Sequence, residues 1–433
     1  MGLIALAGFA TWCLAALKSR PAALILFLLL FSTEQILQSS VDFLRSSAAG
    51  LPLINYLVAG TVALSTTAAV VRRPDLLRGT LSSGQVAVFL LYVWTIFSCW
   101  WSPGAEAGFK ALQTQWPYFV VMFVIAPLLV GDIRDLTSAW RVMLVVVVVQ
   151  SLFMLASPEF KVVGGRLGVD LGGNWRSNPL IIGEVGGYCM ILGALAGSGG
   201  KSRWMLGFRV SAIILGVVIA ILSGSRGQFL FAIVALVFGL PLTKPNLDGR
   251  RYVLGVITAS VLIPLILWVA STVIESGGAD MMKRWSSGSS DEGTQGRAES
   301  AMALISAYLG SPSHWLQGLG FYAFSAMNSY GEPYTHVLFA DVLGEEGLIG
   351  TAIFAVILWS TTSAARELWK WASESSPDDC KSVATLITLT IYQMLLVNKQ
   401  GNIALGFVFF GLMVLTCRLR ERLRNDTFND LNA

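Results

Sequence analysis

The sequence predicts an all-α polytopic membrane protein with about 12 transmembrane helices. Hydrophobic residues make up 55% of the 433 residues and charged residues only 13%, whereas soluble domains carry about 25% charged residues. Apolar runs recur along the whole chain, and a helix needs about 20 apolar residues to cross a bilayer. Because these runs lack the alternation of a membrane β-barrel, the spans are expected to be helices in a single integral membrane domain, residues 1–433.

The apolar runs set the number of expected spans. The first two are short and separated only by Lys18, Ser19 and Arg20, so they are either two short helices or one imperfect span. The first run lacks a basic start and a clear cleavage site, so it is expected to be a span and not a signal peptide. The runs lie at Leu3–Leu17, Pro21–Phe31, Leu51–Val71, Val86–Trp101, Tyr118–Val130, Val142–Ala156, Leu180–Ala196, Met205–Leu222, Phe229–Leu242, Val253–Val273, Leu348–Trp359, Val383–Val397 and Ile403–Cys417.

Basic residues predict the orientation of the spans. Cytoplasmic loops carry an excess of Lys and Arg, and one alternating set of loops is richer in them. This set holds Lys18, Arg20, Arg72, Arg73, Arg78, Arg134, Arg141, Lys201, Arg203, Arg209, Lys244, Arg250, Arg251, Arg366, Lys370, Lys381 and the arginines of the tail RLRERLR. The C-terminus is therefore expected inside and the long loop at residues 275–346 outside, while the side of the N-terminus depends on how the first two runs are counted.

The long external loop is the only sizeable extramembrane segment. Its first part, Gly277–Ser300, is rich in Gly and Ser and predicts an irregular loop. A helix is expected near Arg297–Tyr308, and Gly318 and Gly320 predict a tight turn. The chain holds no repeat, Walker loop or dinucleotide fingerprint, so ATP hydrolysis has no support. Its net charge of +4 does not suggest nucleic acid.

The metal-binding residue types are sparse and scattered. The five cysteines lie in or beside apolar runs, and no pair of them has metal-ligand spacing. The sequence also has no carboxylate pair or His/Asp/Glu cluster at such a spacing. We therefore expect no metal and no cofactor.

Arg226 is the leading candidate for an anion-binding residue. It lies in the motif SGSRG (Ser223–Gly227), between two apolar runs on the side expected to be external. An arginine at a membrane boundary is costly unless it is paired or functional, and a guanidinium group binds phosphate oxygens through two hydrogen bonds. A helix that begins after Gly224 would add its N-terminal amides to the site. The alternative is an arginine whose charge simply reaches the aqueous interface.

Four other basic residues on the same side are further candidates for binding a phosphate or pyrophosphate group. Arg297 opens the predicted helix of the long loop, where the alternative is an ordinary solvated charge. Arg166 and Arg176 lie in a Gly-rich external loop, and Lys399 lies in a very short outer turn. For these three the ordinary external charge is the more common interpretation.

His336 is the candidate base and one of only two histidines. A neutral imidazole can accept a proton from a hydroxyl nucleophile near neutral pH; the alternative is an interfacial histidine bonded to backbone. On a helix Asp341 would not share the face of His336, so Asp341 and Glu345 are interpreted as helix supports. His314 is interpreted as a loop residue. Glu184, near the outer end of its apolar run, suits either a function or an ion pair with an arginine.

Three motifs follow one another in a characteristic order. SGSRG opens a helix, an arginine-led helix precedes a Gly-x-Gly turn in QGLGFYAF, and a histidine leads into a span in HVLFADVLGEEG. This order resembles the O-antigen ligase and polymerase superfamily of bacterial envelope enzymes, and most closely the O-antigen ligases. The resemblance extends from about Leu180 to Gly350 by motif and over the whole chain by hydropathy. Many members have Asn directly after the histidine, where this chain has Val337, so the choice between ligase and polymerase stays open.

The resemblance implies a GT-C-like glycosyltransferase of the bacterial inner membrane, with its active site facing the periplasm and short helices in the periplasmic loop region. Such enzymes take a glycan from undecaprenyl pyrophosphate, and ligases pass it to a sugar of the lipid A core without metal or nucleotide. Carried over by motif, Arg226 matches the arginine that holds the pyrophosphate and Arg297 the second essential arginine. His336 matches the histidine proposed to activate the acceptor hydroxyl.

The candidate residues suit this chemistry. Pyrophosphate is already a good leaving group, so the reaction needs charge stabilisation and a base for the hydroxyl, and attack opposite the leaving group would invert the anomeric carbon. The expected partners are the lipid-linked donor, the lipid A-core acceptor and membrane lipids. The alternatives are an O-antigen polymerase, a protein O-oligosaccharyltransferase and, from another class, a lipid-linked sugar flippase, which would need charges deep in the spans, broken helices and often repeats.

Overall fold

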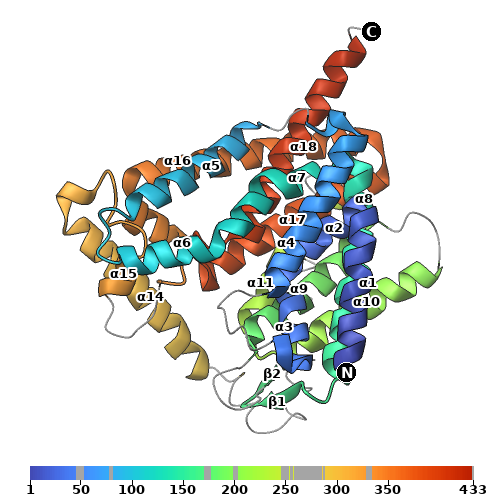
Figure 1. Ribbon diagram of the computed structural model, residues 1–433, viewed down its shortest axis with the longest axis horizontal. Coiled ribbons are helices and arrows are strands. Elements are labelled where there is room, and N and C mark those ends of the chain that lie inside the picture. The colour runs from blue at the N-terminus through green and yellow to red at the C-terminus, as the bar shows by residue number, and fades with distance from the viewer. Residues whose placement is uncertain are drawn as a thin grey trace. The chain divides into compact units, whose positions relative to one another are not determined.

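In the part of the chain that the structure describes, the fold is helical apart from one short β-hairpin (Figure 1). The expectation of an all-α membrane protein is confirmed at this level: among the described residues, six helices are long and apolar enough to cross a membrane, or up to seven if the bent pair α2 (Arg20–Leu28) and α3 (Leu30–Ser40) is one span. The computed structural model describes residues 1–44, 53–77, 81–169, 177–197, 203–244, 288–327 and 334–431, together with Val253, Ile257 and Trp285.

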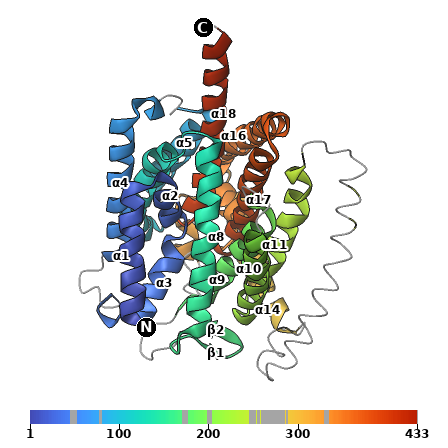
Figure 2. The ribbon, with the colours of Figure 1, turned by 90° about the vertical axis from the view of Figure 1, so that its right-hand side faces the viewer.

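The chain divides into two compact units. The first comprises Met1–Arg73, Leu129–Ser290 and Leu368–Tyr392. A two-stranded antiparallel hairpin follows its helix α8, with Val162 paired to Leu167 (Figure 2). The elements of this unit are α1 (Gly2–Lys18), α2 (Arg20–Leu28), α3 (Leu30–Ser40), η1 (Asp42–Leu44), α4 (Leu53–Arg72), α8 (Ile133–Ala156), β1 (Lys161–Val163), β2 (Arg166–Gly168), α9 (Pro179–Leu195), α10 (Arg203–Leu222), α11 (Arg226–Gly239) and η4 (Pro241–Thr243).

Helices α9 and α10 pack against each other in the first unit. A Cβ atom on Gly186 of α9 would lie 2.8 Å from the carbonyl oxygen of Gly216 on α10, and one on Gly216 would lie 2.6 Å from that of Gly186. Small residues at a crossing let two backbones approach closely, which is how helices pack without a hydrophobic drive inside a membrane.

The second apolar run continues as a broken helix, with α2 and α3 bent by 72° around Leu29. The hydroxyl groups of Ser32 and Thr33 donate to the Leu29 carbonyl at 3.0 and 2.8 Å. Gln150 of α8 bonds to both hydroxyl groups, at 3.0 and 3.1 Å. Polar side chains therefore provide hydrogen-bond partners at the break, as the interior of a membrane requires for backbone polar groups. The run extends beyond the expected Phe31, and α1 is a separate helix.

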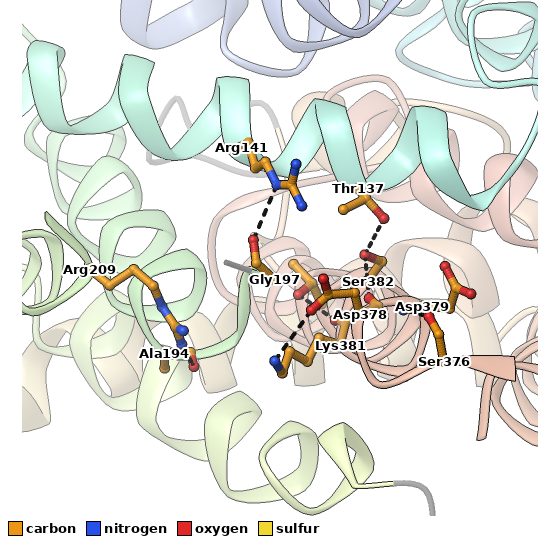
Figure 3. A network of polar contacts seen from close by, with 11 residues as sticks. Thr137, Arg141, Ala194, Gly197, Arg209, Ser376, Asp378, Asp379, Lys381 and Ser382 are labelled. Carbon is orange, nitrogen blue, oxygen red and sulfur yellow. Dashed lines mark hydrogen bonds and ion pairs between the residues drawn. The ribbon is translucent and has the colours of Figure 1, made fainter. Parts of the chain in front are cut away.

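Two arginines bond to backbone carbonyl groups at and just after the C-terminal end of α9, at the end of the first unit that is predicted to be cytoplasmic (Figure 3). Arg209 donates to the carbonyl groups of Gly193 and Ala194 at 2.8 and 2.5 Å, and Arg141 donates to that of Gly197 at 3.3 Å. The last carbonyl groups of a helix lack partners within it, so Arg209 completes α9, and both arginines contribute charge to this end.

The second unit comprises Pro74–Leu128, Asp291–Glu367 and Gln393–Ala433, so α16 and α17 run from one unit into the other. Its helix α18 packs against α5 and against the continuous segment η3–α7. The remaining elements are η2 (Pro74–Leu77), α5 (Ser83–Ser98), α6 (Ala105–Val120), η3 (Val121–Ile125), α7 (Ala126–Leu128), α14 (Gly288–Leu309), η5 (Pro312–His314), α15 (Ala323–Met327), α16 (Leu338–Ser375), α17 (Pro377–Gln400) and α18 (Phe407–Leu431).

The long loop differs in part from its prediction. The helix expected near Arg297–Tyr308 is confirmed, but α14 already begins at Gly288, so the prediction of an irregular segment is wrong from there onward. Gln295 bonds to Glu299 at 2.8 Å across one helical turn, and Leu304 and Tyr308 are buried. Helical pairing and an apolar face therefore override the Gly/Ser composition. Residues 277–284 and the predicted span 253–273 lie outside the described residues, except Val253 and Ile257.

Candidate functional site

His336 lies two residues before α16 and has an unusual backbone. Its φ is +65°, a region that residues other than glycine seldom adopt, and such a conformation costs about 1–3 kcal/mol unless the surroundings hold it. The imidazole is half-buried, and the ring of Tyr334 meets it edge to face with centroids 4.5 Å apart. The histidine thus sits at a constrained point where the chain enters a candidate membrane span.

Asp341 ties down the residue that precedes the histidine. Its carboxyl oxygen Oδ1 accepts a hydrogen bond from the Thr335 hydroxyl at 2.6 Å and one from the Thr335 amide at 3.4 Å. The same hydroxyl accepts from the Val337 amide at 3.1 Å. Asp341 is 1% exposed. The interpretation of Asp341 as a helix support is confirmed, and the support reaches to both neighbours of His336.

Helix α16 is broken at Gly347, nine residues after it begins at Leu338. Gly347 has φ +67° and ψ −162°, so the helix ends and a second helical segment starts at this residue. The carbonyl groups before such a break and the amide groups after it lose their helical partners. In an apolar environment each of these groups needs another partner.

Residues Trp315–Phe321, here called the strap, supply most of those partners. The strap amides of Leu319 and Gly320 donate to the carbonyl groups of Gly344 and Glu345 at 2.9 and 2.8 Å. In the other direction, the amides after the break, Leu348 and Ile349, donate to the strap carbonyl groups of Trp315 and Leu316 at 2.9 and 3.0 Å. The Glu346 carbonyl accepts from the indole of Trp94 at 3.0 Å.

Glycines make the contact between strap and break possible. Gly318 and Gly320 have φ of +77° and +94°, which confirms the predicted tight turn. A Cβ atom on Gly318 would lie 2.0 Å from the Glu345 carbonyl oxygen, and one on Gly347 would lie 2.3 Å from the Gly318 nitrogen. The two sequence motifs QGLG and EEG therefore fit into each other as one unit of structure.

Glu345 links the break to the short helix α15. The Glu345 Oε1 atom accepts a hydrogen bond from the Phe324 amide at 3.1 Å, and Glu345 is 2% exposed. This confirms the interpretation that Glu345 braces an adjacent helix. Tyr322, which precedes α15, has φ +63°. Burial raises the pKa of the Tyr322 phenol, a hydrogen bond with Asn402 lowers it, and the nearby carboxyl groups of Glu345 and Asp341 raise it, so the phenol is protonated at neutral pH.

Glu346 is the third buried acid of this segment and is 0% exposed. The hydroxyl groups beside its carboxyl belong to Ser98 and Thr95 of α5. Both hydroxyl groups donate to backbone carbonyl groups of their own helix. Among the described residues neither carboxyl oxygen of Glu346 receives a hydrogen bond.

Arg297 lies on α14 in the same unit as His336. Two turns further along α14, Leu304 is fully buried, and a Cβ atom on Gly344 of α16 would lie 2.6 Å from it. The Tyr308 hydroxyl donates to the Trp315 carbonyl at 2.7 Å. The helix that carries Arg297 is thus packed against both the broken helix and the strap, and the Arg297 side chain is half-buried.

Arg226 is the first residue of α11, which confirms that a helix begins after Gly224, whose φ is +64°. The Ser223 hydroxyl accepts from the Ser225 amide at 3.2 Å, and the Ser225 hydroxyl donates to the Pro179 carbonyl at the start of α9 at 3.3 Å. These bonds set the SGSRG turn against α9, with Arg226 half-buried at its end.

The weaker candidates are distributed over both units. Arg166 begins β2, whose end is joined to the start of α9 because Val169 and Ser177 exchange hydrogen bonds of 2.6 and 3.0 Å. Arg166 and Arg226 thus both lie on segments held by the start of α9, in the first unit. Arg176 lies outside the described residues. Glu184 accepts from the Tyr188 hydroxyl at 2.5 Å within α9.

Lys399 lies near the end of α17 and belongs to the second unit with Arg297 and His336. The preceding residue, Asn398, accepts from the Phe339 amide at 3.1 Å, which places the end of α17 against the start of α16. Sequence reasoning missed Asn398 and Tyr322. Asn398 carries a readable signal, since it is a polar residue beside Lys399 at the end of an apolar run, whereas Tyr322 is marked only by its backbone conformation.

Comparison with known proteins adds no assignment to this geometry. No family model matches the chain, and no curated protein matches it. The function therefore has to be argued from the motifs and from the arrangement of the residues that carry them.

Proposed function

We propose that the chain is an O-antigen ligase of the bacterial inner membrane. It transfers a glycan from undecaprenyl pyrophosphate to a hydroxyl group of the lipid A core on the periplasmic face, without a metal ion and with inversion at the anomeric carbon. The proposal includes a GT-C-like fold with about 12 spans and the long loop region on the periplasmic side. Arg226 and Arg297 hold the pyrophosphate, and His336 accepts the proton of the acceptor hydroxyl.

One observation carries this proposal. The strap and the break in α16, which contain the second and third motifs of the resemblance, are interlocked through their backbones and glycines. Two motifs that are short in sequence thus act together, and His336 stands beside their frame with a constrained backbone. Strained residues cluster at active sites because precise placement of a side chain is part of the mechanism.

The roles follow from the chemistry of the step. As the bond between the anomeric carbon and the pyrophosphate oxygen breaks, negative charge builds up on the leaving group, and guanidinium groups stabilise it through paired hydrogen bonds. At the same time the acceptor oxygen bonds to the anomeric carbon and loses its proton to the His336 imidazole. Arg166, Arg176 and Lys399 are further candidates for contacts to the pyrophosphate.

Reconstitution of the purified full chain tests the proposal. The chain is mixed with an undecaprenyl-pyrophosphate-linked glycan and lipid A-core acceptor, and ligated product is quantified. We expect His336→Ala, Arg226→Ala and Arg297→Ala each to lower turnover by at least about 10²-fold, as for loss of a base or a charge-stabilising group. The matched controls are His314→Ala and Arg134→Ala, which remove a histidine and an arginine to which the proposal gives no role.

The outcomes separate the alternatives. Full activity of His336→Ala and Arg226→Ala would refute the assigned site, and loss of transfer in chelator would refute the metal-independent reaction. If the product were a longer glycan still attached to the lipid carrier, the enzyme would be a polymerase. A glycan attached to a protein acceptor would indicate an oligosaccharyltransferase.

A lipid-linked sugar flippase is the second candidate, because the chain contains broken helices. Helices α2 and α3 meet at 72°, and α16 is broken at Gly347. Transporters often place such breaks at substrate sites near the middle of the membrane. Proteoliposomes loaded with the lipid-linked glycan and given no acceptor distinguish this function, since a flippase would move the glycan to the other leaflet and a ligase would not.

A further inference from the structure

We propose that Asp341 is a positioning residue that fixes the His336 backbone through the side chain of Thr335. The inference rests on the proposed function, in which His336 is the base. It assigns the buried carboxyl group a part in the reaction without contact to substrate.

The hydrogen bonds around Thr335 carry the first step. The Thr335 hydroxyl donates to Asp341 Oδ1 at 2.6 Å and accepts from the Val337 amide at 3.1 Å. One hydroxyl group therefore connects the residues on both sides of His336 to a single carboxyl group. The left-handed backbone of His336, with φ +65°, lies inside this loop of bonds. Such a conformation persists only where neighbouring groups determine it.

The anchor of these bonds is rigid. Asp341 is 1% exposed, and one turn later on the same face of α16 Glu345 is 2% exposed and bonded to α15. The start of α16 is held by Asn398, which accepts from the Phe339 amide at 3.1 Å. The broken helix and its strap therefore fix the position of His336. Precise placement matters, because a displacement of about 1 Å in a catalytic group can lower the rate about 10²-fold.

The bonds of Asp341 to Thr335 act on the backbone beside the histidine. Both donors of Thr335 bond to Asp341 Oδ1, and Oδ2 receives no hydrogen bond from the described residues. Asp341 therefore acts on the backbone before the histidine. A neutral acceptor of the same shape should serve equally well, since the bonds need an oxygen atom and not a charge.

Histidine NMR of the full chain in detergent gives a readout that does not depend on catalysis. The protein has two histidines, so with ¹³Cε1-labelled histidine His336 gives one resonance and His314 the other, as an internal reference. The test variants are Thr335→Val and Asp341→Ala, and the conservative variants are Thr335→Ser and Asp341→Asn. The matched control is Glu367→Gln, which removes the charge of an acid further along α16 that pairs with Arg424.

We expect Thr335→Val and Asp341→Ala to shift the His336 resonance, leave that of His314 in place and lower kcat by at least about 10-fold with little change in KM. Thr335→Ser, Asp341→Asn and Glu367→Gln should keep both resonances and the turnover. If His336→Ala abolishes transfer while Thr335→Val and Asp341→Ala leave the His336 resonance and kcat unchanged, the positioning role is refuted and the proposed function stands. If His336→Ala keeps full activity, the proposed role of His336 as the base is refuted, and the positioning role of Asp341 is refuted with it. Loss of both resonances together would mean global unfolding and would also refute a local positioning role.

Discussion

At the scale of single residues, Gly347 determines whether α16 can break. Its φ of +67° and ψ of −162° belong to a region that is open almost only to glycine. A methyl group there would also lie 2.3 Å from the Gly318 nitrogen. We expect Gly347→Ala to lower stability by about 3 kcal/mol or more, from strain and steric overlap together. Thermal unfolding in detergent measures the loss.

Gly60→Ala is the matched control for this substitution. Gly60 lies within α4, and a Cβ atom there would meet nothing within 4 Å. Alanine also favours a helix over glycine by about 1 kcal/mol. The control should therefore unfold at the same or a higher temperature than the parent chain. Equal behaviour of the two variants would show that the conformation of Gly347 is not required.

Glu345 provides a second test at the same scale. Its carboxyl group is buried and accepts from the Phe324 amide. Removal of the acceptor in Glu345→Ala leaves a buried amide without a partner, which costs about 1–3 kcal/mol. Glu345→Gln keeps an oxygen in the same place and should lose little. Chemical denaturation of the two variants measures this, and a large loss for the glutamine variant would indicate that the negative charge itself is needed.

At the scale of elements, the sequence predicted those features that depend on local chemistry. The SGSRG motif correctly indicated a helix start after Gly224, because glycine and serine are typical of such a boundary. The turn at Gly318 and Gly320 was predicted for the same reason. The exchange of bonds between the strap and α16 could not be predicted, since backbone groups 25 or 33 residues apart carry no signature in their side chains.

The helical segment α6–η3–α7 shows how a missing donor is replaced by another element. Pro127 has no N–H group, so the carbonyl of Phe123, four residues earlier, loses its usual α-helical partner. Gln85 of α5 donates to that carbonyl through Nε2 at 2.6 Å, and the intervening turn is a π-helix. The side chain of one helix thus completes the backbone of its neighbour within an apolar region.

This replacement predicts a coupling between Gln85 and Pro127. Gln85→Ala should lower stability by about 1–3 kcal/mol, because it leaves the Phe123 carbonyl without a partner. Pro127→Ala restores an N–H group to the helix, so the double variant should lose less than Gln85→Ala alone. A double-mutant cycle of unfolding free energies measures the coupling. Additive effects of the two substitutions would contradict the account.

At the scale of the whole molecule, the basic residues at the end predicted to be cytoplasmic have a double role. In the first unit Arg209 caps α9. In the second unit Arg418 and Arg422 of α18 donate to the carbonyl groups of Leu76 and Asp75 at 2.6 and 3.0 Å. The positive-inside rule expects these charges to set the orientation, and the same side chains also bond to backbone carbonyl groups at helix ends.

The orientation of the chain can be tested on α16, because the candidate base lies two residues before this helix begins and basic residues lie near its other end. From Leu348 to Ser375 the helix is about 42 Å long at 1.5 Å per residue, which exceeds the hydrocarbon core of about 30 Å. Its two ends should therefore reach opposite aqueous faces. The positive-inside rule places the strap outside the cytoplasm and the end with Arg366 and Lys370 inside it.

Cysteine labelling of intact spheroplasts measures this prediction. In a background without the native cysteines, Ser313→Cys lies two residues before the strap and Ser375→Cys at the far end of α16; both positions are exposed. A membrane-impermeant maleimide should label Ser313→Cys at once and Ser375→Cys only after permeabilisation. The opposite pattern would place His336 at the cytoplasmic face. Because the proposed donor and acceptor meet on the periplasmic face, that result would refute the proposed ligase function. It would not affect the description of the strap and the broken helix.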